Sequence, residues 1–122
     1  MVTKEELTAQ SMHYVRTVGM TTMRGRGFYF PVDSAMASNG RIYVLSRSIE
    51  RVASDSLRIT MLNEEGEYFG VFGKAGENDG EFRWPCGIAL DDKDHVSVTD
   101  EHLHRHSTFP PDGKFTGKWG PL

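Results

Sequence analysis

The chain has 122 residues, of which 38% are hydrophobic and 25% are charged. This is the composition of one folded domain, and it excludes a disordered tail. No run approaches the roughly 18 apolar residues of a membrane span, and the first residues lack the apolar stretch of a signal peptide. We therefore expect a soluble cytoplasmic protein that does not insert into a membrane. The single cysteine, Cys86, excludes an intrachain disulfide.

The charges are distributed unevenly along the chain. Residues 1–61 contain eight Lys and Arg against five Asp and Glu, a net +3, whereas residues 62–122 contain six against twelve, a net −6. Opposite charges on the two halves favour a head-to-tail contact between copies of the chain, which leads to rings or filaments. The total charge of −3 disfavours nonspecific binding to nucleic acids.

An internal repeat is visible in the sequence. Positions 28–46 align with 82–100, and with a smaller offset positions 58–73 align with 105–120. The change of offset indicates a seven-residue insertion within 47–57 of the first copy. Fixed-period self-similarity of this kind predicts a repeat architecture.

The same repeat reaches into the N-terminal part of the chain. The larger of the two offsets also places Tyr14, Val18 and Gly19 on Tyr68, Phe72 and Gly73. We therefore divide the chain into three parts, which are an N-terminal segment 1–25 with the outer strand of a partial repeat at 12–19, a first repeat 26–73 and a second repeat 74–122.

Each full repeat contains four strand signals. In the second repeat these are the runs 85–91, 96–100, 105–109 and 114–119, and turn sequences such as Pro111-Asp112-Gly113 separate them. Four antiparallel strands repeated at about 40–50 residues are typical of a β-propeller blade. The predicted fold is therefore all-β, with two blades of four antiparallel strands in the chain.

The motifs of the second repeat resemble those of the NHL family. They are Gly80-Glu81-Phe82, the run from Trp84 to Asp91, the run from Val96 to Asp100, the run from Asp112 to Phe115, and Trp119-Gly120. The resemblance covers about 26–122 and implies a propeller, usually of six blades, whose first strand lines a central channel. Some NHL propellers are RNA-binding modules, and some resemble lyases that amidate peptides with metal-bound histidines.

Two blades do not close a propeller. Each blade buries both faces against its neighbours, so two blades alone leave two broad faces in water. We expect a homo-oligomer, with a six-bladed trimer favoured over a four-bladed dimer. The alternative is that the two blades are a fragment of a longer propeller.

Arginines are concentrated in the loops expected on one face of the blades, around the channel mouth. They are Arg24, Arg26, Arg47, Arg51 and Arg83. Guanidinium groups suit carboxylates, phosphates and interface aromatics, so these residues are the candidate ligand-binding set. Solvated surface charge paired with nearby carboxylates is the competing interpretation.

Three histidines, His102, His104 and His106, alternate along the start of a predicted strand, which would place their side chains on one face. They are the candidate ligands of a divalent metal, although no third ligand outside this strand is evident and hydrogen-bonded histidines explain the pattern as well. No other cofactor is expected.

Catalysis has little support in the sequence. No nucleophile elbow, phosphate loop or zinc-protease motif is present. Asp33, Asp91 and Asp100 are expected to hold turns. The aromatic residues at matched positions of the repeats are expected to pack between blades, and they are Phe28, Tyr68, Phe72, Phe82, Trp84, Phe115 and Trp119.

The interpretation that we favour is a non-catalytic NHL-like module that binds a protein or peptide through its loop face. A metal-dependent lyase or hydrolase and an RNA-binding module are the alternatives, and whether the protein is an enzyme stays open.

Overall fold

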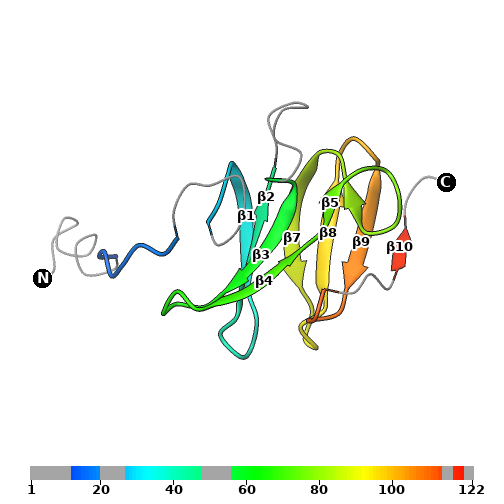
Figure 1. Ribbon diagram of the computed structural model, residues 1–122. Coiled ribbons are helices and arrows are strands. Elements are labelled where there is room, and N and C mark those ends of the chain that lie inside the picture. The colour runs from blue at the N-terminus through cyan, green and yellow to red at the C-terminus, as the bar shows by residue number, and fades with distance from the viewer. Residues whose placement is uncertain (1–11, 20–26, 48–55, 114–116, 120–122) are drawn as a thin grey trace, which may run out of the picture.

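The computed structural model describes residues 12–19, 27–47, 56–113 and 117–119. Two antiparallel sheets, each of four strands in sequence order, lie side by side (Figure 1). Blade one consists of β1 (Pro31–Met36), β2 (Ile42–Ser46), β3 (Arg58–Leu62) and β4 (Tyr68–Phe72). Blade two consists of β7 (Pro85–Leu90), β8 (Val96–Asp100), β9 (Arg105–Phe109) and β10 (Gly117–Trp119). A short parallel pair, β5 (Lys74–Ala75) and β6 (Glu81–Phe82), lies between them in the chain.

The repeat predicted from the sequence is confirmed strand by strand. The inner strands β1 and β7 begin at the aligned prolines Pro31 and Pro85, and both have an irregular register just after the proline. The third strands begin at the aligned arginines Arg58 and Arg105. The all-β blade architecture is therefore confirmed, and the insertion that changes the offset falls mostly on 48–55, outside the described residues. No helix in the described part of the chain is long and apolar enough to cross a bilayer.

The main core lies between the two blades. Because side chains alternate across a strand, each sheet turns one apolar set toward the other. Blade one contributes Tyr43, Leu45, Ile59 and Met61, and blade two contributes Ile88, Val96, Val98 and Phe109. The Phe72 ring joins the two sets, with its centre 6.3 Å from that of Tyr43 and 5.0 Å from that of Phe109.

Polar side chains link the same two blades at both ends of the inner strands. The Ile88 N–H donates to Asp33 Oδ2 (2.9 Å), beside the irregular start of β7. At the opposite end, the Ser38 N–H donates to Asp94 Oδ1 (3.0 Å) and the Ser38 hydroxyl donates to the other oxygen of that carboxylate. The Asp33 bond joins the two inner strands, and the Ser38 bonds join a turn of blade one to a turn of blade two.

The predicted outer strand at 12–19 is absent from the structure, which assigns no strand to these residues. Met12, Tyr14 and Val15 are 77%, 78% and 70% exposed. A strand needs a partner for its backbone hydrogen bonds, and in the described part of the chain no strand pairs with this segment. The expected boundary between 25 and 26 lies outside the described residues.

We expect Gly73→Ala to destabilise the protein by about 2–4 kcal/mol, because Gly73 has a φ of +84° and a Cβ there would lie 2.5 Å from the Phe82 ring. Gly40→Ala is the matched control, since Gly40 has a φ of +86° and open space around it. Urea unfolding of both variants separates the steric cost from the backbone cost. Equal losses of stability would show that Phe82 does not pack against Gly73.

The Ser38–Asp94 link predicts a dependence of stability on pH. The hydrogen bonds from the Ser38 side chain and backbone hold the pKa of Asp94 below its usual value of 3.8. Since the folded pKa is the lower one, this contribution is present above the unfolded pKa and is lost as pH falls through the folded pKa. We expect Ser38→Ala to be less stable at neutral pH and to lose less stability than the wild type between about pH 5 and pH 2. Ser34→Ala, on β1, should keep the wild-type pH profile in the same urea titrations.

Candidate functional site

The two blades present an aromatic residue at the same position of their loop face. Phe30 and Trp84 are counterparts in the repeat, and each immediately precedes the proline that begins an inner strand. The Arg47 N–H donates to the Phe30 carbonyl (3.0 Å), and the Glu101 N–H donates to the Trp84 carbonyl (3.1 Å). Equivalent backbone bonds thus fix the two aromatic residues next to the ends of β2 and β8.

Arg47 lies between these two aromatic rings. Its guanidinium carbon is 4.2 Å from the centre of the Trp84 ring and 5.2 Å from the centre of the Phe30 ring. Both rings remain open to solvent, with Trp84 40% and Phe30 43% exposed. Each cation–π contact contributes about 0.5–1 kcal/mol at an exposed site. We call Phe30, Arg47 and Trp84 the arginine–aromatic stack.

Two features of the stack are unusual for a purely structural contact. Arg47 Nε is buried without a hydrogen-bond partner, and within the described residues no acceptor faces the rest of the guanidinium. Phe30 has a φ of +52°, which a bulky residue rarely adopts and which costs about 1–3 kcal/mol. One exposed face therefore carries a strained aromatic residue and an arginine whose Nε has no hydrogen-bond partner among the described residues.

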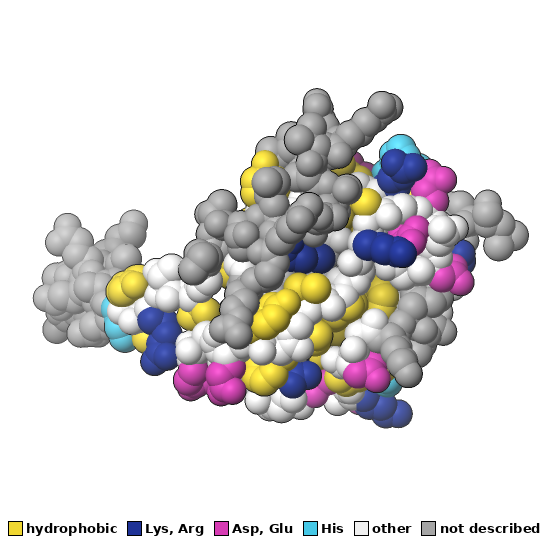
Figure 2. Space-filling model, in the orientation of Figure 1, with side chains coloured by type: hydrophobic (Ala, Val, Ile, Leu, Met, Phe, Trp, Pro, Cys, Tyr) yellow, Lys and Arg dark blue, Asp and Glu magenta, His cyan; other side chains and the backbone are white. Residues whose placement is uncertain are grey.

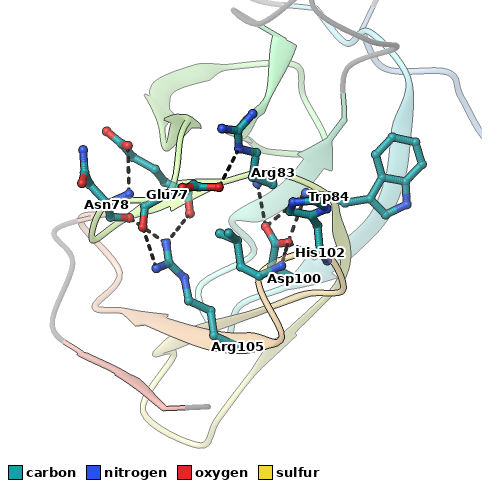
Figure 3. A network of polar contacts seen from close by, with 9 residues as sticks. Glu77, Asn78, Arg83, Trp84, Asp100, His102 and Arg105 are labelled. Carbon is teal, nitrogen blue, oxygen red and sulfur yellow. Dashed lines mark hydrogen bonds and ion pairs between the residues drawn. The ribbon is translucent and has the colours of Figure 1, made fainter. Parts of the chain in front are cut away.

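Asp100 fixes the loop that contains Trp84 by accepting hydrogen bonds from its backbone. Its carboxylate is 4% exposed and accepts four backbone N–H bonds (Figure 3). The donors are Arg83 at 2.8 Å, Trp84 at 3.1 Å, His102 at 3.1 Å and Leu103 at 3.0 Å. Because bonds to a charged acceptor are stronger than neutral ones, this single side chain fixes two loops at the edge of blade two.

Arg105 fixes the other part of the same loop. Its guanidinium donates to the carbonyls of Glu77, Asn78 and Glu81 at 2.9, 2.6 and 2.9 Å (Figure 3). The equivalent Arg58 of blade one donates to the Gly27 carbonyl (2.9 Å), and Gly27 is the counterpart of Glu81. An arginine at the start of the third strand therefore supports the loop before the inner strand in both blades.

Comparison with known proteins bears on this arrangement. No family model matches the chain. The RING finger protein nhl-1 of Caenorhabditis elegans is 35% identical over 89 residues, which is 73% of this chain. The chain belongs to the NHL-repeat family. It spans 9% of the length of nhl-1, so the NHL resemblance of the motifs is confirmed for the repeat unit alone.

The fold of this NHL-repeat chain also occurs in a solved structure. A Bacteroides fragilis protein described as exported superposes with a TM-score of 0.63 over 84% of this chain. The identity is 15%, and the match covers 27% of that protein. At 15% identity this comparison shows that the two proteins share the fold, and it supports no statement about function.

The structure describes two of the five arginines predicted on the loop face. Arg47 is in the stack, and Arg83 lies on the adjacent loop with its Nε 3.5 Å from Glu77 Oε1. Both partners of that ion pair are more than half exposed, so the pair adds little stability. Arg24, Arg26 and Arg51 lie outside the described residues.

The predicted strand 105–109 is confirmed as β9, but His102 and His104 precede it, so the three histidines do not alternate along one strand. Residues 101–104 form a turn, and only His106 lies on β9. The turn forms because Asp100 accepts the N–H groups of 102 and 103, and His104 has a φ of +53°. Among the residues that the structure describes, no three His, Cys, Asp or Glu side chains group as they would around a metal ion.

The expected turn-holding role agrees with the contacts of Asp91 and Asp100, whereas Asp33 lies within β1 and holds no turn. Asp33 links the inner strands, and Asp91 Oδ1 accepts the N–H groups of Lys93 (2.8 Å) and His95 (2.9 Å). Trp84 packs against the other blade only in part, since its ring contacts Arg47 of blade one and the residue remains 40% exposed. The repeat alignment of Phe30 with Trp84, both before proline, was the signal that could have identified the stack.

We expect Asp100→Asn to destabilise the protein by about 2–4 kcal/mol, because an amide NH₂ cannot accept the buried N–H bonds that one carboxylate oxygen now receives. Thermal or urea unfolding measures the loss. Asp92→Asn, at an exposed position of a turn, is the control and should stay within about 0.5 kcal/mol of the wild type. A similar small change in both variants would contradict the role assigned to Asp100.

Proposed function

We propose that this NHL-repeat chain is a non-catalytic binding module that recognises a protein partner at the arginine–aromatic stack. The observation that supports this most is the position of Arg47, whose cation is held between two exposed rings and has no acceptor among the described residues. Exposed aromatic residues and arginine together are enriched at the energetic centres of protein interfaces. Loops on a rigid scaffold are the usual place for such residues.

The chemistry of the stack favours a carboxylate on the partner. The two rings restrict the guanidinium to a fixed orientation, so less side-chain entropy is lost when its N–H groups bind an acceptor. A Glu or Asp side chain, or a C-terminal carboxylate, provides a planar acceptor of the right shape. Trp84 and Phe30 then offer apolar surface to the neighbouring part of the peptide.

RNA is less well suited to this face. A nucleic-acid site follows the phosphate backbone with several cations. Here Arg83 is paired with Glu77, and the exposed Glu101 follows directly after the end of β8. Of the two loop-face arginines that the structure describes, this leaves Arg47 to meet a phosphate backbone, which calls for several such cations. The metal-dependent alternative gains no support from the positions of the three histidines.

The test is binding to short immobilised peptides, each made in an acidic form and in an isosteric amide form with Gln for Glu and Asn for Asp. We expect the protein to prefer acidic forms, and we expect Arg47→Gln to weaken that binding at least about tenfold. Arg47→Lys should restore little of the acidic-peptide binding, because an ammonium group is not planar, does not stack on rings as a guanidinium does and cannot donate two parallel hydrogen bonds to one carboxylate. Lys93→Gln, in an exposed turn that joins β7 to β8, is the control for a change of net charge.

Two outcomes would overturn the proposal. One is acidic-peptide binding that Arg47→Gln and Lys93→Gln weaken equally, because general charge would then explain it. The other is tighter binding to a single-stranded oligouridine than to any peptide, with a steep loss of affinity as salt rises. Trp84→Ala completes the series, and it should weaken binding without changing the free energy of unfolding by more than about 1 kcal/mol.

A further inference from the structure

The arginine–aromatic stack has a spacing that bears on the shape of its partner. The guanidinium carbon of Arg47 is 4.2 Å from the centre of the Trp84 ring and 5.2 Å from the centre of the Phe30 ring. In the described part of the chain the two rings make no contact with each other, so they lie on different sides of the guanidinium. A partner therefore meets an apolar ring, a cation and a second apolar ring in a row.

This row is fixed before a partner binds. The Arg47 N–H donates to the Phe30 carbonyl (3.0 Å), and the Asp100 carboxylate accepts the Trp84 N–H (3.1 Å). Trp84 is 40% exposed and Phe30 is 43% exposed, so a partner can contact both rings without moving the loops. A preformed site of this kind favours a partner whose side chains already have the same spacing, because little has to be ordered when the two meet.

Regular peptide conformations differ in the spacing of side chains on one face. In an α-helix, residues three and four positions apart share a face and are about 4.5 and 6 Å apart along the axis. In a β-strand, residues on one face are two positions and about 6.4–6.8 Å apart. In a polyproline II helix, they are three positions and about 9.3 Å apart. The 4.2 and 5.2 Å of the stack agree best with the helical spacing and are shorter than the other two.

We propose, building on the proposed function, that the partner segment is an amphipathic α-helix with one acidic residue within its apolar stripe. The Glu or Asp carboxylate binds Arg47. The apolar residue three positions away packs on Trp84, and the apolar residue four positions away in the opposite direction packs on Phe30. The two apolar residues are then seven positions apart, which keeps them on one helix face two turns apart.

The charges near the stack do not select such a helix by themselves. Arg83 is paired with Glu77, and the exposed Glu101 follows the end of β8. In Figure 2, side chains of Lys or Arg, of Asp or Glu and of His lie next to one another at the upper edge, where the loop between β8 and β9 lies in Figure 1. A rim with both signs of charge steers neither acidic nor basic partners strongly. The acidic residue is therefore selected by Arg47, whose guanidinium can donate two parallel hydrogen bonds to one carboxylate.

The first test compares the affinity of the full-length chain for labelled alanine-based peptides of about 16 residues, long enough for partial helix formation. Helix-spaced peptides have a central Glu with leucines three and four positions away on its two sides, in either order. The strand-spaced peptide has the same composition, with the leucines two positions away on each side. We expect the better helix-spaced peptide to bind at least about tenfold more tightly than the strand-spaced one, and to become more helical by circular dichroism on binding.

The second test uses double-mutant cycles to match each leucine with a ring. Replacing the leucine three positions from the Glu should be coupled to Trp84→Ala, and replacing the other leucine should be coupled to Phe30→Ala, each by at least about threefold in Kd. The crossed pairs should be additive. Phe69→Ala is the matched control, because Phe69 is also an exposed ring under an arginine, with the guanidinium carbon of Arg41 4.4 Å from its centre, and lies on β4.

The outcomes separate this inference from the proposed function. If the helix-spaced and strand-spaced peptides bind equally and both lose affinity when Gln replaces Glu, the helical partner is wrong and the acidic-peptide function stands. Additivity in both cycles, or equal coupling of the leucines to Phe69→Ala, would overturn the helical register. If no peptide binds, or if the Gln peptide binds as tightly as the Glu peptide, the proposed function fails together with this inference.

Discussion

A β-sheet has two faces, and the organisation of this chain depends on which faces are covered. Each blade buries one face against the other blade, through Tyr43, Phe72 and Phe109 among others. Burial of one such side chain stabilises the fold by about 1.5–3 kcal/mol, more than most single polar contacts. The polar links between the blades, such as Asp33 to Ile88, are possible only because this core brings the inner strands together.

Charged side chains that bind backbone groups fix the loops next to this core. The carboxylate of Asp100 and the guanidinium of Arg105 are engaged with loop backbone, and this fixes Trp84 relative to blade two. Arg47 then spans the gap between the blades by stacking on Trp84 and Phe30. Because the loops are fixed by the fold, a partner that binds at the stack orders few groups on this side, which favours affinity.

The strands of both blades could be predicted from the sequence, and the reason is physical. Burial alternates with a period of two on the sheets, and the turns need glycine at positive φ, as at Gly40 and Gly113, so both leave a pattern that repeats with the blades. The predictions that failed also have physical causes. Residues 12–19 have the composition of a strand but no partner in the described structure, and pairing depends on residues far away in the chain.

The site was harder to predict than the fold. Alternation suggested a strand through His102 and His104, but Asp100 binds the following N–H groups and imposes a turn, which only the folded loop reveals. Trp84 is a large aromatic residue of a kind usually found in cores, but it is 40% exposed and its ring lies under Arg47. The repeat alignment pairs Phe30 with Trp84, whereas the arginine that joins the two rings stands at a position where the blades differ, since its counterpart is Glu101.

The uneven distribution of charge along the chain has a limited effect on how firmly copies of the chain could associate. The net +3 of residues 1–61 and −6 of residues 62–122 favour head-to-tail encounter between copies. Attraction between exposed charges is screened over about 8–10 Å at physiological salt, so it affects the rate of encounter more than the stability of the contact. The stability of a stacked blade depends on the groups that lose water. On the side of blade two away from blade one, the hydroxyls of Ser97 and Thr99 would lose water if an apolar sheet packed there, at a cost of about 1–3 kcal/mol each. The side chains that a stacked sheet would cover therefore matter more for the stability of such a contact than the net charge of the halves does.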